Sequence, residues 1–346
     1  MAKIKIIKPG LLTSVQDLGR HGYQQYGVCV SGAMDHVSAR LANILLGNDE
    51  GEGLLELTML GPQIEFSDPM VIAITGGDLQ ATINGLAVKM NRSLRVNSGD
   101  KLDFKGMKAG CRAYIAFAGG IDVPLIMGSK STYTRGNMGG YKGRALKAGD
   151  VLSINKPSQP MDTLVGREIG ECFYEYTDDI ELRVVLGPQE DAFTEEGIKT
   201  FFNSSYMVTN ECDRMGYRLE GEKVDHKEGG DIISDGIAMG AVQIPSHGQP
   251  IIMMADRQTT GGYTKIANVI TVDLPRVAQA KPGDKISFKR VSLDEAHILL
   301  RDLENKIAQS KINCDKTVRE ILSTRQFKLK INGRAYDVMV EELKNY

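Results

Sequence analysis

The sequence contains no tryptophan and no pair of closely spaced cysteines. Its five cysteines are far apart along the chain: Cys29, Cys111, Cys172, Cys212 and Cys314. An odd number of cysteines without a Cys-x-x-Cys pair supports neither a zinc site nor a disulfide framework. We therefore expect small buried thiols in a reducing compartment.

A strong net charge is also missing, because 42 Lys and Arg face 44 Asp and Glu and the formal charge is −2. Nucleic acids and anionic membranes attract basic proteins, so we expect neither as a partner. The N-terminal segment lacks the apolar core of a signal peptide. The longest apolar runs, such as Met70–Ile74 and Ile251–Ala255, are too short to span a bilayer. We expect a cytoplasmic protein.

Familiar catalytic motifs are absent as well. Gly128–Thr132 resembles a phosphate-binding loop but has no glycine directly before its lysine. Gly136–Gly143 carries Met138 where the dinucleotide-binding fingerprint needs glycine. The five histidines are scattered, and none has the spacing of a metal-binding pair. The sequence predicts no metal site.

Glycine, in contrast, is abundant, with 38 residues in a chain of 346. It follows no Gly-X-Y period and forms no flexible linker, so the excess indicates many tight turns between strands. At about 150 residues per domain, the length predicts about two domains. We expect a mainly β protein with a few helices.

Three segments have helical periodicity. Asp35–Leu46 begins at a capping Asp and ends before Gly47, Asp191–Phe202 is shorter, and Leu293–Gln309 opens with the capping box Ser292-x-x-Glu295. Short apolar runs bounded by turn residues predict strands. These runs are Val71–Thr75, Ala113–Phe117, Glu181–Leu186, Ile251–Met254, Val269–Val272 and Lys285–Lys289.

The two halves of the chain share short patterns. Asp17–Tyr23 is echoed by Asp213–Tyr217, and the Leu-Gly-Pro-Gln of residues 60–63 recurs at residues 186–189. Gly-Asp followed by alternating apolar residues occurs at Gly99, Gly149 and Gly283. Together these patterns predict two related β-barrel-like halves, with the polar stretch Asn155–Asp162 as the linker.

The first candidate functional segment is the glycine-framed loop Thr13–Tyr23. It contains an amide, a carboxylate, a guanidinium and a phenol, and such loops let backbone N–H groups approach an oxygen-rich ligand while an arginine supplies charge. The alternative is that Asp17 and Arg20 pair with each other across a turn. The residue pattern leaves both interpretations open.

The second segment, Ser31–Asp35, lies just before the first predicted helix. Donors at a helix N-terminus stabilise an anion or a developing oxyanion. The alternative is a plain N-cap formed by Ser31 or Asp35, and it is the favoured interpretation for Asp35.

The third segment joins the loop Ile244–Pro250, a buried strand and the polar run Ala255–Lys265. Asp256 has the chemistry of a base or an orienting group, Arg257 that of an oxyanion clamp, and Gln258 that of an amide reader. Lys265 offers a second cation. Consecutive hydrogen-bonding side chains after a buried strand are hard to explain by packing alone.

Three long motifs in the same order give the chain a resemblance to the biotin-dependent carboxyltransferase / allophanate hydrolase subunit 2 family. The motifs are Pro9–Arg20 with Ser31–Asp35 and Leu41–Asn43, then Ala118–Pro124 with Gly128–Ser129 and Ser131–Thr132, and finally Ala255–Tyr263. The resemblance implies two cyclophilin-like β-barrel domains, at residues 1–160 and 161–310.

The resemblance also implies partners and chemistry. Free-standing family members of this length resemble the C subunit of a 5-oxoprolinase, which works with subunits B and A to open the cyclic amide 5-oxoproline to glutamate with ATP. It implies a small amide substrate, with ATP used by the complex. The implied catalytic residues are Asp17, Arg20, Asp256, Arg257 and Lys265, and the implied substrate-binding residues are Gln16, Tyr23, Ser31, Met34, Ser129, Thr132, Gln258, Thr259, Thr260 and Tyr263.

The C-terminal residues 324–346 alternate like a hairpin around Asn332–Gly333. They resemble the start of a biotin carrier domain, although no Met-Lys-Met biotinylation site follows. An edge hairpin or a partner-docking strand is the favoured interpretation. Two alternatives remain open: a carboxyltransferase that takes its carboxyl group from biotin on another protein and acts on a urea-like amide, and a Kip-type subunit that regulates by binding.

Overall fold

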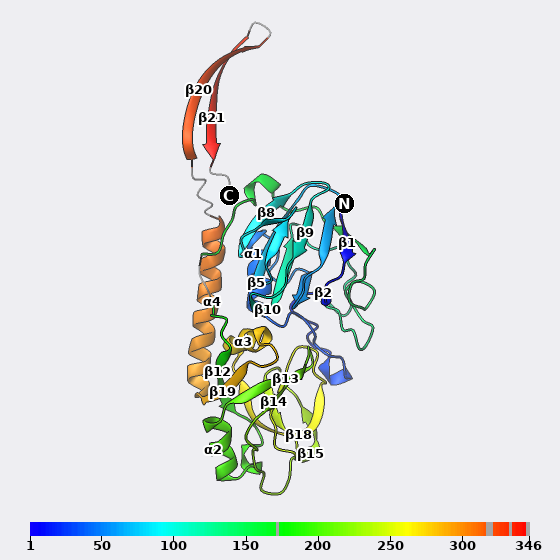
Figure 1. The fold of residues 1–346 in the computed structure, drawn as a ribbon, viewed down its shortest axis with the longest axis vertical. Coiled ribbons are helices and arrows are strands. Elements are labelled where there is room, and N and C mark those ends of the chain that lie inside the picture. The colour runs from blue at the N-terminus through cyan, green and yellow to red at the C-terminus, as the bar shows by residue number, and fades with distance from the viewer. Residues whose placement is uncertain (171–172, 316–320, 332–333, 344–346) are drawn as a thin grey trace.

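The computed structural model describes residues 1–170, 173–315, 321–331 and 334–343. Figure 1 shows two β-rich lobes stacked along the long axis, with a long helix beside them and a hairpin beyond the end of that helix. The first lobe is built from the N-terminal half of the chain and the second from the C-terminal half. This mainly β arrangement with a few helices confirms the expected fold class.

The first lobe contains two sheets that share one core. Their strand orders are β11-β1-β4-β9-β6-β7 and β2-β3-β10-β5-β8. Ile4 from the first sheet and Ile72 and Ile115 from the second are fully buried together. The strands are β1 Ala2–Lys8, β2 Leu12–Gln16, β3 Leu54–Thr58, β4 Gln63–Phe66, β5 Met70–Asp78, β6 Ala81–Ile83, β7 Leu86–Ala87, β8 Arg92–Val96, β9 Lys101–Phe104, β10 Ala109–Phe117 and β11 Val151–Ile154.

The second lobe contains one eight-stranded sheet in the order β12-β19-β13-β14-β17-β16-β18-β15. β12 pairs with both β19 and β18. The first seven strands in this order therefore close into a ring, and β15 lies at the edge beside β18. This closure is the expected barrel. The strands are β12 Asp179–Leu186, β13 Tyr206–Cys212, β14 Gly216–Glu220, β15 Asp231–Gly236, β16 Ala241–Ile244, β17 Ile251–Met253, β18 Thr260–Val269 and β19 Lys285–Arg290.

The helices follow the capping chemistry of the sequence. In α1, Asp35 accepts a hydrogen bond from the Ser38 backbone N–H, and in α4 the predicted capping box of Ser292 and Glu295 forms in both directions. The second predicted helix starts later than expected, because Thr194 caps it. The helices are α1 His36–Leu45, α2 Glu195–Asn203, α3 Leu274–Gln279 and α4 Leu293–Asp315, with short 3-10 turns η1 Gln24–Tyr26, η2 Met161–Thr163, η3 Glu190–Ala192 and η4 Thr271–Asp273.

One strand prediction was wrong. Residues 269–272 do not form a strand of their own, because Val269 ends β18 and η4 begins at Thr271. Pro275 follows in the first turn of α3, where its missing N–H is not needed. An apolar run in front of a helix therefore resembles a strand by periodicity alone.

The three Gly-Asp turns share one geometry. At Asp100, Asp150 and Asp284 the carboxylate accepts the N–H three residues earlier, at 2.7, 2.7 and 2.9 Å. The glycine before each aspartate has a positive φ, of 88°, 87° and 94°, which side-chain-bearing residues rarely adopt. Each turn leads directly into a strand, so the turns are a structural repeat within and between the lobes.

The two lobes are interlocked and not merely adjacent. Met34 belongs to the first lobe but is fully buried in the core of the second, among Ile180, Val242 and Ile286. Residues 155–178, which include the expected linker, connect β11 to β12. A third apolar cluster joins α1 to α4 through Leu303 and Ile307.

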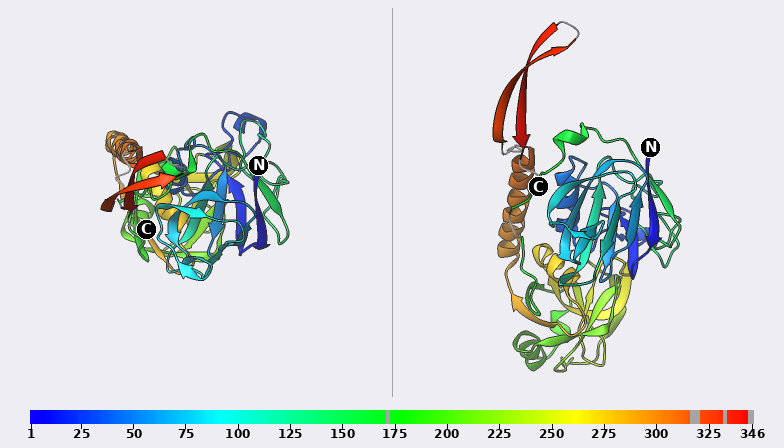
Figure 2. Two further views of the ribbon diagram at one scale, coloured as in Figure 1. Left: turned by 90° about the horizontal axis from the view of Figure 1, so that it is seen from above. Right: turned by 45° about the horizontal axis from the view of Figure 1, so that its top comes forward.

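Helix α4 lies along the side of the molecule and leads to the hairpin (Figure 2). It is fixed to α1 by Arg40, which donates to Glu304 at 2.7 Å through both terminal nitrogens. The expected hairpin consists of β20 Ile321–Ile331 and β21 Arg334–Leu343, which pair antiparallel. Its predicted turn Asn332–Gly333 and residues 344–346 lie outside the described residues. Among the described residues, no helix is long and apolar enough to cross a membrane.

Candidate functional site

Asp17 organises the first loop of the site. Its carboxylate accepts hydrogen bonds from the Gly19 N–H and the Ser129 hydroxyl, both at 2.8 Å, from the Lys130 N–H at 2.5 Å and from the Ser131 hydroxyl. Asp17 is buried. It therefore fixes the loop after β2 to the segment Ser129–Ser131, which lies more than 100 residues later in the sequence.

Arg20 is fully buried at the same place. Its Nε donates to the Ile126 carbonyl at 2.9 Å and its Nη2 to the Ser131 carbonyl at 2.8 Å, while Nη1 has no hydrogen-bond partner among the described residues. Burial lowers the pKa of this guanidinium, and the charges of Asp17 and Asp256 oppose the change. The alternative of a direct Asp17–Arg20 pair does not match these contacts, since each side chain binds other groups.

Gly139 makes room for this guanidinium. A Cβ at Gly139 would come within 2.7 Å of Nη2 of Arg20 and 2.0 Å of the Ser131 carbonyl, and its φ is 69°. A side chain at this position would displace the arginine. The glycine-rich segment 136–143 therefore packs closely against the Arg20 guanidinium at Gly139.

Four of the five N–H groups of Ser31–Asp35 donate hydrogen bonds within the chain. Ser31 donates to the Ala255 carbonyl at 3.1 Å, Ala33 to the Asp17 carbonyl at 2.8 Å and Met34 to Glu56 at 2.8 Å. The Asp35 N–H donates to the Tyr114 hydroxyl at 2.8 Å. These four N–H groups are therefore not free to bind an anion at the helix N-terminus, as the sequence had suggested.

Ser31 itself remains a candidate through its side chain. It has a φ of 55°, a left-handed conformation that is rare for a residue other than glycine. Its hydroxyl is buried and has no partner among the described residues. Met34, by contrast, lies in the second-lobe core and not at a surface.

The second lobe contributes Asp256 and Arg257, shortly after β17. Asp256 accepts two hydrogen bonds from Arg214, from Nε and Nη2, both at 3.0 Å. Arg257 donates from Nε to the Ile237 carbonyl at 3.0 Å and from Nη1 to the Met254 carbonyl at 3.2 Å. Burial lowers the pKa of Arg257. Two motif residues that are neighbours in sequence thus have different partners.

Cys29 and Tyr133 lie where the three motifs meet. The interaction with the Cys29 thiol, together with burial, raises the pKa of Tyr133 to about 12. Cys29 lies within electrostatic range of Arg20 and Arg257, and Asp256 within range of Tyr133. From the sequence, Cys29 was expected only to pack in the core, and Tyr133 was not among the candidate residues, although it directly follows the middle motif.

An open groove of about 550 Å³ lies between the lobes beside Arg257. Its wall from the first lobe is η1, which Tyr23 precedes as N-cap, and its wall from the second lobe is formed by the segments 236–239 and 257–260. The lining residues are Gln24, Gln25, Gly236, Ile237, Ala238, Met239, Arg257, Thr259 and Thr260. Three predicted site residues, Arg257, Thr259 and Thr260, therefore line one groove.

Several predicted residues serve other contacts. Lys265 donates to Asp235 at 2.9 Å, and Tyr263 is 40% exposed on the neighbouring part of β18. Thr132 donates its hydroxyl to the Val15 carbonyl at 2.8 Å, and Ser129 is bound to Asp17. None of these four residues lines the groove.

Three glutamines carry further unpartnered atoms. Gln16 donates to Ser14 and to the Thr132 carbonyl, but its Oε1 is buried without a partner among the described residues. Gln258 Oε1 and Gln243 Nε2 are likewise buried without a hydrogen-bond partner among the described residues. Buried polar atoms without partners are rare, and each calls for an explanation such as a bound ligand, water or ion. Gln243 lies on β16, and no motif in the sequence pointed to it.

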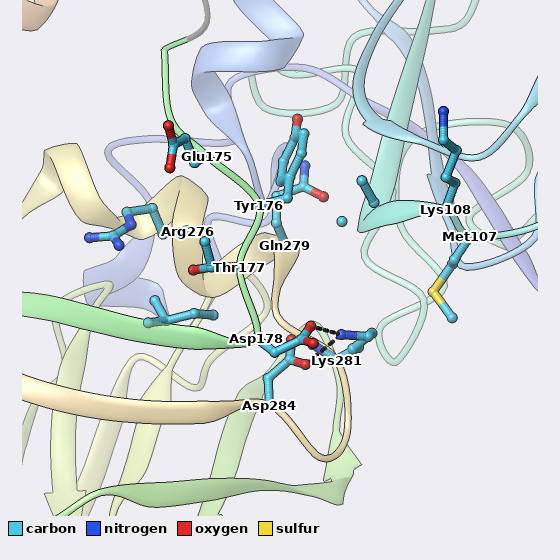
Figure 3. Close-up of a pocket in the computed structure, with 13 residues that line it drawn as sticks. Met107, Lys108, Glu175, Tyr176, Thr177, Asp178, Arg276, Gln279, Lys281 and Asp284 are labelled. Carbon is cyan, nitrogen blue, oxygen red and sulfur yellow. Dashed lines mark hydrogen bonds and ion pairs between the residues drawn. The ribbon is translucent and has the colours of Figure 1, made fainter.

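A second cavity, of about 500 Å³, is lined in part by residues 175–178, which belong to the segment that connects β11 to β12 (Figure 3). Lys281 crosses one side of it, paired with Asp178 at 2.6 Å and with Asp284 at 2.5 Å. None of the residues that the sequence singled out as candidates lines this cavity. Among the described residues, no cluster of His, Cys, Asp and Glu has the composition of a metal site.

Comparisons with known proteins give a consistent result. A family model described as the carboxyltransferase domain, subdomain A and B, matches residues 26–290. The C subunit of 5-oxoprolinase from Escherichia coli (strain K12) is 38% identical over 293 residues, which cover 85% of this chain and 93% of that protein. Urea amidolyase of Lachancea kluyveri is also 38% identical, over 85% of this chain and 17% of that protein. The crystal structure of the Kluyveromyces lactis urea carboxylase matches 98% of this chain and 32% of that one, with 32% identity and a TM-score of 0.81.

Proposed function

Because the chain belongs to the carboxyltransferase domain family with subdomains A and B, we propose that it is the C subunit of a multi-subunit 5-oxoprolinase. The observation that carries this proposal is the match to the C subunit of the Escherichia coli 5-oxoprolinase over 93% of that protein's length. The match spans nearly the whole of that subunit, whereas the match to the Lachancea kluyveri urea amidolyase spans 17% of that protein. The partners are subunits B and A, and the compartment is the cytoplasm.

The reaction consumes ATP and water and opens the lactam of 5-oxoproline to glutamate. A lactam is resonance-stabilised, so its carbonyl oxygen must be activated before the ring opens. Buried guanidinium groups suit this task, because an ion pair or hydrogen bond to a developing oxyanion or a phosphate is strong in a site that excludes water. Arg20, with its unpartnered Nη1, and Arg257, at the groove, are the residues for this role.

The remaining polar groups position the substrate. Thr259 and Thr260 line the groove, and the unpartnered amide atoms of Gln258 and Gln243 complement the donor and acceptor of an amide. ATP enters as a substrate of the whole complex. The free N–H of Arg20 fits a phosphate as well as an oxyanion, and we assign no further ATP contact to this chain.

The test is reconstitution. The chain is co-expressed with candidate subunits B and A, and ATP-dependent release of glutamate from 5-oxoproline is measured. The complex should be active and this chain alone inactive; Arg257→Ala should abolish turnover in the intact complex. Activity of the isolated chain, or full activity of the Arg257→Ala complex, contradicts the proposal.

One observation favours a second candidate, carboxyl transfer from biotin to a urea-like amide. The crystal structure of the urea carboxylase covers 98% of this chain, so the match extends into the hairpin. Under this alternative, biotin arrives on another protein. Transfer of a carboxyl group from a carboxybiotinylated carrier to urea by the isolated chain, without glutamate release by the complex, supports the alternative.

A further inference from the structure

Arg214 lies between two carboxylates from different lobes. Its Nε and Nη2 bind Asp256 of the second lobe at 3.0 Å each, and its Nη1 binds Glu56, on β3 of the first lobe. Nη2 also donates to the Gly32 carbonyl at 2.7 Å. All three charged side chains are buried, with side-chain exposures of 7% for Arg214, 1% for Glu56 and 7% for Asp256.

Glu56 is itself held rigidly by the first lobe. Its second carboxylate oxygen accepts the Met34 N–H at 2.8 Å and the Tyr114 hydroxyl at 2.9 Å. The Tyr114 hydroxyl in turn accepts the Asp35 N–H at 2.8 Å. The carboxylate therefore has a fixed place relative to the start of α1, and it presents one oxygen to the second lobe.

We propose that Glu56 is a positioning residue that acts through Arg214 to hold the carboxylate of Asp256 beside Arg20 and Arg257. Glu56 does not line the groove, and both of its carboxylate oxygens are already bound within the chain, so it does not act on the substrate directly. Without its charge, Arg214 keeps a carboxylate partner on one side only and gains freedom to move. The site then assembles correctly only when the lobes meet in register.

The expected size of the effect follows from the geometry of catalysis. A displacement of about 1 Å from a distant substitution costs about 100-fold in rate. Glu56→Gln keeps the shape of the side chain and a carbonyl oxygen for one donor but removes the charge. In the reconstituted 5-oxoprolinase complex, on whose activity this readout rests, kcat should fall by about 10- to 100-fold while KM changes by less than about threefold.

A double-mutant cycle separates positioning from a purely architectural role. If Glu56 acts through Asp256, then Glu56→Gln added to Asp256→Asn lowers kcat by no more than about twofold further. A merely structural role makes the two losses multiply, and that outcome overturns the proposal. Arg183→Lys is the matched control, because Arg183 makes a bidentate pair with buried Asp273 in the same lobe, at 2.9 and 2.6 Å. It should leave kcat unchanged.

Hydrogen exchange tests the proposal without any activity. In the wild type the Asp256 N–H donates to the Arg214 carbonyl at 2.8 Å and the Arg257 N–H to the Met254 carbonyl at 3.2 Å. Glu56→Gln should speed exchange of these two amides by about tenfold, and Arg183→Lys should not. Unchanged exchange in Glu56→Gln overturns the proposal even if the complex does not act on 5-oxoproline, a result that would contradict the proposed function alone.

Discussion

Two of the buried arginines near the lobe junction, Arg20 of the first lobe and Arg214 of the second, differ in what they bind. Arg20 and Arg214 belong to the echoed segments Asp17–Tyr23 and Asp213–Tyr217. Arg214 binds two carboxylates and a carbonyl, whereas Arg20 binds two carbonyls and leaves Nη1 without a partner in the described part of the chain. The difference indicates that the second-lobe arginine joins the lobes, and the first-lobe arginine keeps a donor for a ligand.

Electrostatics agrees with this division. Burial disfavours the charge on both guanidinium groups, and for Arg20 it lowers the pKa. For Arg214 the charges of Asp256 and Glu56 outweigh burial, so its pKa is raised. The same sequence pattern thus places Arg214 between two carboxylates in one case and Arg20 among carbonyl groups, without a direct carboxylate partner, in the other.

The largest effect should come from removing the paired arginine. Arg214→Met leaves Glu56 and Asp256 as uncompensated buried charges, which costs about 3–5 kcal/mol of unfolding free energy. Arg20→Met breaks only hydrogen bonds to carbonyls and should cost about 1–3 kcal/mol. Urea unfolding of the full chain measures both. Equal destabilisation by the two substitutions would remove the proposed distinction.

The next effect concerns turnover. Arg20→Lys keeps a positive charge but loses the planar fork with its free donor, so kcat of the reconstituted complex should fall by about 10²- to 10³-fold. Arg218→Lys is a suitable control, because Arg218 makes an exposed pair with Glu211 at 3.4 Å. A normal kcat for Arg20→Lys would argue against a ligand at Nη1.

The smallest effect is a change in tyrosine titration. The pKa values of Tyr133 in the first lobe and Tyr206 in the second are both raised to about 12, the former mainly by its interaction with the Cys29 thiol and the latter mainly by burial. Cys29→Ala should lower the pKa of Tyr133 and leave that of Tyr206 unchanged. The difference in tyrosinate absorbance between variant and wild type measures this change; no difference between about pH 10 and 12 would contradict the assigned cause.

The same shift has a consequence for stability. Because the folded-state pKa of Tyr133 is raised to about 12, its contribution is fully present below the unfolded value of about 10 and is lost as the pH rises from about 10 to 12. Tyr133→Phe should therefore make the loss of stability over this alkaline range less steep. Chemical unfolding at several pH values provides the measurement.

Local chemistry made parts of the fold predictable from sequence. The start of α1 at Asp35, the capping box at Ser292 and the Gly-Asp turns all depend on residues within a few positions of one another. The motif residues Arg257, Thr259 and Thr260 were also recognisable, because they belong to a polar run that follows a buried strand without a break. Their placement at a groove needed the structure.

Contacts between distant segments were not predictable. Glu56 and Arg214 are separated by 158 positions, and an isolated Glu on a strand gives no sign of a buried partner in another lobe. The place of Met34 was not predictable either. Its position in a motif suggested a substrate contact, whereas its side chain is buried in the core of the second lobe. Tertiary contacts decide such residues, and periodicity along one strand does not record them.

The burial of Met34 in the opposite lobe has a consequence for biosynthesis. Met34 leaves the ribosome long before the strands β12–β19 that enclose it have been made. The nascent first lobe therefore exposes an apolar anchor until the rest of the chain arrives, and exposed apolar surface of this kind is what chaperones bind. We expect translation speed between residues 155 and 290 to influence the yield of native protein.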